Sequence, residues 1–202
     1  LFIQLKTATM FEIIDLSQEI FSGMPVFPGL PEVEIDIHAS HEQWEGLAES
    51  EEVSPAVLKL TFGEHTGTHV DALNHMARQY RGQSIDAMSL TMFYTEGICL
   101  DLSHKSLRDL IEPADLDRAL AEANLDIKPG DTVLLYTDHY RRAFGTENWP
   151  HGPGISAAAA CWLGRQKIAA FGVETASPAC ARFRISKCIV FAEKWVLRIT
   201  RI

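Results

Sequence analysis

Four side chains that bind metals well lie close together in one stretch of the chain. His65, His69 and His75 are three of its eight histidines, and Asp71 stands between them. Imidazole nitrogens and carboxylate oxygens are good ligands for Zn²⁺ or Mn²⁺, and clusters of His and Asp mark functional sites. We therefore predict that His65, His69 and Asp71 bind a divalent cation.

The backbone must turn for these residues to share one cation. In a straight strand, His65 and His69 would lie about 13 Å apart, at roughly 3.3 Å per residue. Their nitrogens could not then both reach a metal at bond lengths of about 2.1 Å. Gly67 lies between them and reaches backbone angles that other residues avoid. Thr66 and Thr68 can bond to backbone groups that such a turn leaves unpaired. The spacing therefore predicts a turn centred on the glycine.

His75 follows Asp71 by four residues, and two roles are open to it. It could be a fourth ligand or the acid/base of a reaction. Three protein ligands plus one open position is the catalytic pattern, whereas four ligands close a site. Imidazole also exchanges protons near neutral pH. We therefore favour His75 as the acid/base.

The segments around the cluster mix strand and helix patterns, which predicts an α/β or α+β domain. Alternating apolar residues in 33–37 indicate a half-buried strand. Short apolar runs predict further strands at 11–16, 57–62, 97–102, 132–136 and 168–173. Helices are expected at 113–124, where Pro113 suits the first turn, and at 157–163, after the cap Ser156. A length of 202 residues predicts one domain.

The composition suits a globular protein and excludes several partners. The chain is 47% hydrophobic with a formal net charge of -9, and it has no basic run, which argues against nucleic acid. No apolar stretch approaches the roughly 18–20 residues that span a bilayer. The cysteines, Cys99, Cys161, Cys180 and Cys188, form no C-x-x-C pair, and residues 1–9 lack the features of a signal peptide. We expect a cytoplasmic protein with free thiols.

The stretch from His65 to His75, HTGTHVDALNH, resembles the signature H-x-G-T-H-x-D-x-P-x-H of the cyclase family, which includes bacterial kynurenine formamidase and isatin hydrolase. Further similar segments are 15–17, 23–29, 151–156 and 172–178. The resemblance runs from about Phe11 to Pro178. It departs from the signature at Leu73, where the family has proline, and this changes the stiffness of the backbone more than the chemistry.

This resemblance implies an α/β fold of the swivelling β/β/α kind, a homodimer, and hydrolysis of a C–N bond. His65, His69 and Asp71 carry over as ligands of Mn²⁺ or Zn²⁺, and His75 carries over as the proton-transfer residue. Phe27 carries over as an aromatic wall against a flat substrate. The substrate is then a small aromatic amide, either an aryl formamide of tryptophan and kynurenine catabolism or a cyclic amide such as isatin.

The resemblance stops before the C-terminus. Members of the family continue with a second histidine-containing stretch and a final core strand, whereas residues 179–202 show neither pattern and contain no histidine. We therefore expect a leader or disordered N-terminus at 1–9, a cyclase-like domain at 10–178 that is incomplete at its C-terminal end, and an aberrant tail at 179–202. A shift of reading frame near 179–182 would explain the tail, and an inactive truncated relative is the alternative to an enzyme.

A different class of enzyme also fits part of the cluster. His69 and Asp71 match half of the two-histidine, one-carboxylate triad of non-haem iron oxygenases. The third ligand would have to be His104, His139 or His151. Those enzymes usually have an all-β fold, so the helical patterns argue against this hypothesis.

A few further residues have roles that the sequence leaves open. Glu174 follows a strand end, so it either lines the site or is solvated. His151 either edges the pocket or lies in an ordinary loop. Phe62, Trp149 and Trp162 are expected in the core rather than in a pocket.

Overall fold

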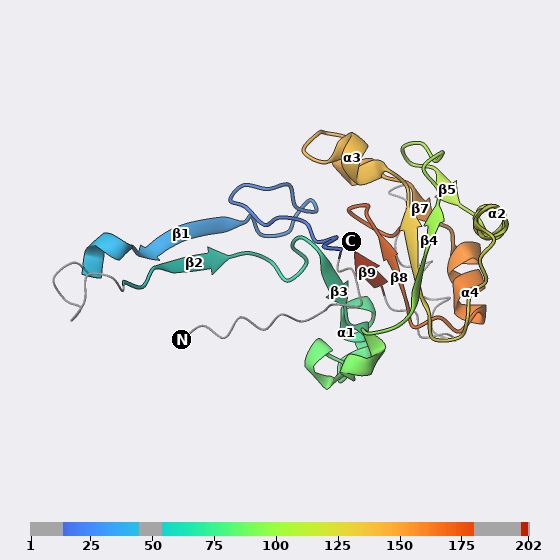
Figure 1. Cartoon of the computed structure of the whole chain (residues 1–202), viewed down its shortest axis with the longest axis horizontal. Helices are drawn as coiled ribbons and strands as arrows, with labels where there is room; N and C mark the ends of the chain where they lie inside the picture. The colour runs from blue at the N-terminus through green and yellow to red at the C-terminus, as the bar shows by residue number, and fades with distance from the viewer. Residues whose placement is uncertain (1–13, 45–53, 180–198, 202) are drawn as a thin grey trace, which may run out of the picture.

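The computed structural model describes residues 14–44, 54–179 and 199–201. A five-stranded sheet with the order β3-β9-β8-β6-β4 forms its centre (Figure 1). The strands are β3 (His69–Asp71), β4 (Gly97–Asp101), β6 (Thr132–Tyr136), β8 (Ala170–Val173) and β9 (Ile199–Arg201). β4, β6, β8 and β9 are parallel, and β3 is antiparallel to β9. With helices against this sheet, the α/β fold class is confirmed.

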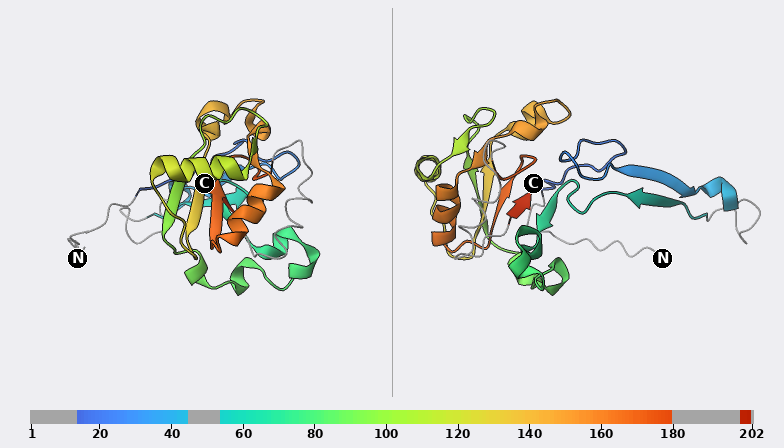
Figure 2. Two further views of the ribbon diagram at one scale, coloured as in Figure 1. Left: turned by 90° about the vertical axis from the view of Figure 1, so that its right-hand side faces the viewer. Right: turned by 180° about the vertical axis from the view of Figure 1, so that it is seen from behind.

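Two helices, α2 (Pro113–Ala123) and α4 (Ala157–Arg165), lie on the same face of the sheet (Figure 2). Both begin where the sequence predicts. Ser156 Oγ accepts the Ala159 N–H at 3.0 Å and so satisfies a donor that the first turn of α4 leaves unpaired. α2 ends where Asn124 takes a left-handed conformation with a φ of 52°.

The core lies between these helices and the parallel strands. Leu100, Val133 and Phe171 come from the strands, Leu116 and Leu163 come from the helices, and each is at most 2% exposed. Continuous apolar runs are expected of parallel strands that lie beneath helices. This packing holds the carboxyl ends of β4, β6 and β8 at one edge of the sheet.

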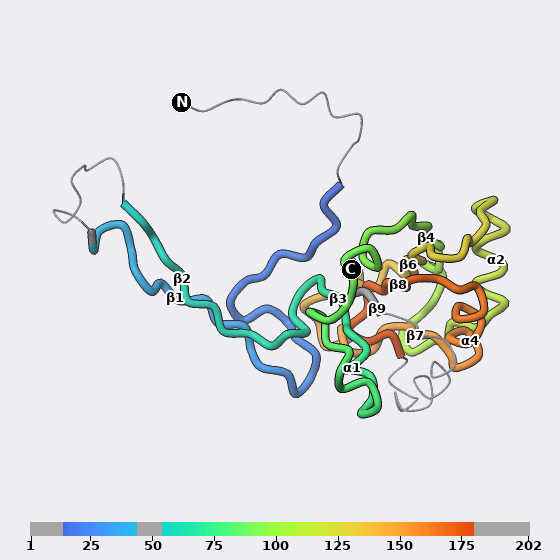
Figure 3. The backbone as a smooth tube through the Cα atoms, turned by 90° about the horizontal axis from the view of Figure 1, so that it is seen from below, coloured from blue at the N-terminus to red at the C-terminus, as the bar shows by residue number. Residues whose placement is uncertain are grey.

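Strands β1 (Glu34–Ala39) and β2 (Val57–Thr61) form an antiparallel hairpin that extends away from the sheet as an arm (Figure 3). Ile37 lies opposite Leu58, so their side chains share one face of the arm. Ile37 is 72% exposed and Leu58 is 57% exposed. The prediction of a half-buried strand is therefore wrong at Ile37, because the arm lies away from the body of the molecule.

Shorter elements connect these parts. Two short parallel strands, β5 (Leu110–Ile111) and β7 (Gly154–Ile155), pair with each other. Two short helices are α1 (Leu73–Met76) and α3 (His139–Ala143). Single turns of 3-10 helix are η1 (His41–Trp44), η2 (Arg78–Tyr80), η3 (Ile85–Ala87), η4 (Leu90–Met92) and η5 (Trp149–His151). Among the described residues, no helix has the length and apolar character needed to span a bilayer.

Both ends of the chain differ from the sequence prediction. Of the strand expected at 11–16, residues 14–16 form no strand and are exposed, and residues 11–13 lie outside the described part. Within the expected tail, residues 180–198 also lie outside it. Residues 199–201 form the short strand β9 between β3 and β8, which the sequence pattern of the tail does not predict.

Candidate metal centre

Gly67 forms the turn that the two histidines require. Its φ is +62°, a left-handed conformation that glycine adopts without strain. A Cβ at this position would also lie 3.1 Å from Ile20 Cγ1, which leaves little room for a side chain. The hydroxyl of the buried Thr66 donates to the Gly63 carbonyl oxygen at 2.7 Å, so the local bond expected of this threonine forms. The turn predicted from the spacing of the histidines is present.

Three ligand atoms converge beside this turn. His65 Nδ1 lies 2.8 Å from Asp71 Oδ1 and 3.2 Å from His69 Nε2. His69 Nε2 lies 3.2 Å from Asp71 Oδ1. Octahedral and tetrahedral coordination with bonds of about 2.1 Å separate neighbouring ligand atoms by about 3.0 and 3.4 Å. The separations in this protein are close to those values, so the three side chains fit a single divalent cation.

The ligand side chains are largely removed from water. Asp71 is 3% exposed, and the side chains of His65 and His69 are 11% and 12% exposed. A carboxylate in such a place needs a positive partner or hydrogen bonds to compensate for lost hydration. His65 Nδ1 lies 2.8 Å from Asp71 Oδ1, and a cation bound by both side chains would compensate the charge of the carboxylate.

The backbone orients His69 toward the two other ligands. Its Nδ1 lies 2.9 Å from the Gly67 carbonyl oxygen, and because a carbonyl only accepts, this nitrogen carries the proton. Nε2 then holds the lone pair that faces His65 and Asp71. A hydrogen bond on the second nitrogen is the usual way in which a metal-binding histidine is oriented. The same turn therefore brings His69 near and sets its tautomer.

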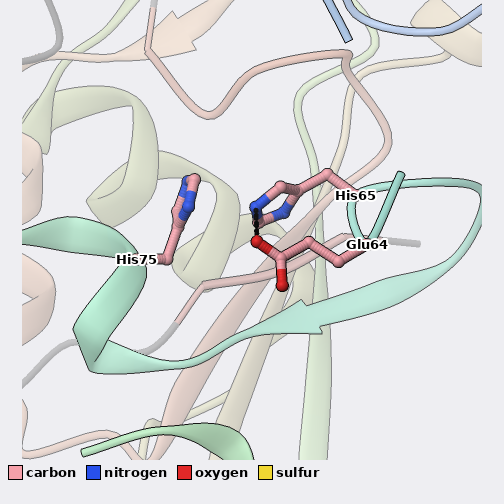
Figure 4. Close-up of side chains that lie close together, drawn as sticks. All are labelled: Glu64, His65 and His75. Atoms are coloured by element: carbon pink, nitrogen blue, oxygen red, sulfur yellow. Dashed lines mark ion pairs between the residues drawn. The ribbon is translucent and has the colours of Figure 1, made fainter. Parts of the chain in front are cut away.

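Glu64 and His75 contact His65 from another side (Figure 4). Glu64 Oε1 lies 3.5 Å from His65 Nε2, and the ring centroids of His75 and His65 are 3.9 Å apart. These three residues form a second group that could hold a cation, but it shares His65 with the first. A neutral imidazole offers one lone pair, so the better-buried group with Asp71 is the stronger candidate. Glu64, whose side chain is 85% exposed, faces the second nitrogen of His65.

His75 is held beside the ligands by the short helix α1. Leu73, which stands where the family signature has proline, is 6% exposed and anchors the first turn of this helix. His75 itself is exposed to solvent. The structure thus brings His75 to the site through its contact with His65, and its role as the acid/base stays a prediction.

Strand β3 carries two of the ligands, and β9 joins that strand to the sheet. His69 pairs with Arg201 and Asp71 pairs with Ile199. β9 pairs on its other side with β8. The backbone of both ligands is therefore tied to the parallel strands through residues 199–201.

A pocket that is open to solvent lies beside His65 and His69. Phe27, Trp149 and Glu174 also line it. Phe27 therefore lies where a substrate wall is expected. Trp149 is 8% exposed, so the prediction that it is buried is correct. The prediction that it does not line a pocket is wrong. Glu174 lines the site instead of being fully solvated, which settles the alternative that the sequence leaves open.

The three remaining candidate ligands of an iron triad lie elsewhere. Within the described parts of the chain, no group of metal-ligating side chains contains His104, His139 or His151. His139 is fully buried, and its Nε2 lies 3.0 Å from the Trp149 carbonyl oxygen. None of the three histidines that the oxygenase hypothesis requires therefore belongs to the site, and the α/β fold differs from the all-β fold expected of those enzymes.

The family of the chain follows from a comparison with known proteins. Residues 14–179 match the family described as putative cyclase. The chain belongs to this cyclase family, as its histidine signature indicates.

Individual relatives agree with this family. The chain is 29% identical to isatin hydrolase of Roseibium aggregatum over 124 residues, which are 56% of this chain and 47% of that protein. It is 29% identical to kynurenine formamidase of Salinibacter ruber over 125 residues, 59% of this chain and 55% of that protein. The chain thus spans about half the length of these relatives. Isatin hydrolase A from Ralstonia solanacearum has the same fold, with a TM-score of 0.76 at 22% identity over 93% of this chain and 77% of that one.

Replacement of Asp71 by Asn should abolish tight binding of a divalent cation. The amide keeps the size of the side chain but removes the only negative charge among the three ligands. Because loss of a residue that merely orients a ligand costs 10–100-fold in metal affinity, loss of a ligand should cost at least about 100-fold. Calorimetric titration with Mn²⁺ and Zn²⁺ measures this, with the exposed Asp86→Asn as the matched control. Unchanged binding in folded Asp71→Asn protein would rule out this site.

Proposed function

We propose that this chain is a metal-dependent hydrolase that cleaves the C–N bond of an aromatic amide. An aryl formamide is the first candidate substrate, and a cyclic amide such as isatin is the second. The observation that carries the proposal is the convergence of His65, His69 and Asp71 beside a cavity with aromatic walls. The names of the relatives, isatin hydrolase and kynurenine formamidase, support the class of reaction.

Two imidazoles and one carboxylate suit either Zn²⁺ or Mn²⁺. A cation bound by them acts as a Lewis acid that polarises a carbonyl oxygen and lowers the pKa of water. His65, His69 and Asp71 would hold this cation as three protein ligands, which is the number typical of a catalytic site. Their burial also excludes bulk water from the ligand side of the site and strengthens the electrostatic interactions there.

We propose His75 as the residue that moves the proton. Its ring lies 3.9 Å from that of the ligand His65, so it borders the reacting groups without belonging to the buried ligand set. An imidazole in this place can accept a proton from the attacking water and return it to the leaving nitrogen. Its exposure lets it exchange protons with solvent between turnovers.

The cavity walls favour a flat substrate. Phe27 and Trp149 both line the cavity that opens beside the ligands. Aromatic pairs gain about 0.5–1.5 kcal/mol beyond the burial of their surface when the rings are offset-stacked or edge-to-face. A planar aryl amide could contact these rings while its carbonyl group faces the ligand set. This supports an aromatic substrate over an aliphatic one.

We further propose that two copies of the chain associate through the arm. Ile35 and Ile37 on β1 lie opposite Leu60 and Leu58 on β2, which gives the arm one apolar face. An isolated hairpin of two strands is marginally stable, and a contiguous exposed apolar surface marks an interaction site. A second copy is the occupant that agrees with the homodimer implied by the family signature.

The hydrolase assay is the direct test of the main proposal. Metal-depleted protein should not hydrolyse formanilide, and Mn²⁺ or Zn²⁺ should restore hydrolysis with a stoichiometry of about one ion per chain, since three ligand atoms converge on one point. Release of aniline is followed by absorbance, and opening of the isatin ring is followed in parallel. If folded, cation-loaded protein hydrolyses neither compound, the inactive-relative alternative is favoured over an enzyme.

Replacement of His75 by Ala should lower kcat while cation binding persists. Loss of a general acid/base typically costs 10²–10⁴-fold in rate. Cation affinity should change by no more than a few-fold, because the three ligands remain. The matched control is His38→Ala on the arm, which should leave kcat unchanged. Loss of cation uptake in His75→Ala protein would identify this histidine as a fourth ligand instead.

Replacement of Leu58 by Ser should weaken self-association. Full burial of a leucine is worth about 1.5–3 kcal/mol, so the dissociation constant of the dimer should rise at least about tenfold. Lys59→Ser is the matched control, because Lys59 pairs with Asp36 on the opposite, charged face of the arm. Analytical ultracentrifugation measures both variants. A wild-type chain that sediments as a monomer at all concentrations would contradict the proposed dimer.

A further inference from the structure

Glu174 follows β8 and lies at the junction of the cavity and the turn after β6. Its Oε1 accepts the Thr137 N–H at 2.6 Å, the Thr137 hydroxyl at 2.7 Å and the His139 N–H at 2.9 Å. Its Oε2 accepts the Tyr140 N–H at 3.3 Å. Four donors from residues 137–140 therefore meet one carboxylate.

This arrangement makes Glu174 an anchor rather than a base. A carboxylate offers about four acceptor sites on its two oxygens, and three donors already occupy Oε1. Hydrogen bonds to an ionised acceptor are roughly twice as strong as neutral ones. The turn after β6 is consequently bound to the end of β8 by strong, directional contacts at the edge of the cavity.

Residues that follow this turn contact Trp149. His139, the first residue of α3, is fully buried, and its ring stacks on that of Trp149 with centroids 5.6 Å apart and an interplanar angle of 10°. His139 Nε2 lies 3.0 Å from the Trp149 carbonyl oxygen, and because a carbonyl only accepts, this nitrogen donates. Tyr140 and Phe144 meet the same indole edge-on, at 6.0 and 5.1 Å.

The residue after η5 packs closely against the side chains of Thr175 and His139. Gly152 ends the single turn η5 that begins at Trp149. A Cβ at Gly152 would lie 2.6 Å from Thr175 Cγ2 and 2.9 Å from His139 Cδ2, so only glycine fits there. Thr175 follows Glu174 directly in the chain. Glu174 thus binds the turn after β6, while Thr175 packs against Gly152 at the end of η5.

The turn after β6 is also stabilised by hydrogen bonds to Asp138 that do not involve Glu174. Arg141 and the Tyr136 hydroxyl both donate to the carboxylate of Asp138, and these hydrogen bonds lower the pKa of Asp138 to about 2. Asp138 therefore stays ionised and engaged at neutral pH. With Asp138 and its partners in place, a change at Glu174 should loosen the inner side of the turn without unfolding it.

We propose that Glu174 is a positioning residue that fixes Trp149 as the wall of the cavity and thereby sets the affinity for a flat substrate. The proposal rests on the function proposed above, in which an aryl amide lies against this wall. It assigns Glu174 no contact with the reacting atoms. The affinity for the aromatic ring of the substrate, rather than the rate of bond cleavage, should then depend on this carboxylate.

The Glu174→Gln variant tests this directly. In either orientation its amide group faces at least one of the four donors with another N–H, so the turn loses a partner while the volume stays the same. Displacement of a positioning group by about 1 Å can cost up to 10²-fold, and we expect KM for formanilide to rise about tenfold with kcat within about twofold of wild type. The exposed Glu147→Gln, which removes the same charge from the neighbouring loop, should leave both constants unchanged.

A second variant reaches the same contact from its other end. Thr137→Val keeps the shape of a side chain that is 2% exposed and removes only the hydroxyl donor to Glu174. It should raise KM in the same direction by a smaller factor. The double variant should raise KM by less than the product of the two single effects, because both act through one contact. Simple multiplication of the two effects would overturn the proposal.

The outcomes separate this inference from the proposed function. If wild-type protein hydrolyses formanilide and folded Glu174→Gln protein has an unchanged KM, the positioning role is wrong while the enzyme stands. A fall in kcat at constant KM would also overturn it, because Glu174 would then act on the chemistry. If wild-type protein binds formanilide without cleaving it, the proposed function fails, and the dissociation constant of formanilide takes the place of KM in the same comparison.

Discussion

A buried carboxylate held between two imidazoles is the interaction on which the rest of the site depends. Asp71 is 3% exposed and lies within 3.2 Å of a nitrogen of both His65 and His69. Such a group is stable only if its charge is compensated, which a proton or a cation can do. The left-handed turn at Gly67 allows the convergence, and the pairing of β3 with β9 holds the backbone of two ligands. The geometry of the ligands is thus built into the backbone.

The metal centre and the cavity wall come from different parts of the fold. The ligands belong to one continuous segment at the edge of the central sheet, whereas Trp149 and Glu174 belong to loops that follow β6 and β8. Ligand sites at the carboxyl ends of parallel strands are general in open α/β sheets, because loops from several strands meet there. The arm of β1 and β2 is a third part, and it extends away from the central sheet (Figure 1). The candidate ligands, the cavity wall and the apolar pairs of the arm therefore belong to separate elements.

Sequence patterns correctly predicted those elements for which local hydrogen bonding and the burial of apolar residues favour the same secondary structure. The strand expected at 132–136 has those bounds, and α4 begins after the cap Ser156. The patterns failed where exposure depends on distant parts of the chain. The alternation at 33–37 shows that side chains point to opposite faces, but it does not show what covers each face, and Ile37 is exposed. The apolar residues at 14–16 form no strand, because an apolar run alone does not supply a pairing partner.

The sequence by itself determined which residues form the candidate metal site. His65, Gly67, His69 and Asp71 lie within seven residues, so the reach of the backbone and the freedom of one glycine decide their geometry locally. Only the tertiary structure decided that Trp149 forms the wall and that Glu174 holds it. Both residues are far from the ligands along the chain, and they come together through sheet pairing and side-chain packing. Such long-range contacts leave no spacing in the sequence, because they depend on how whole elements close against one another.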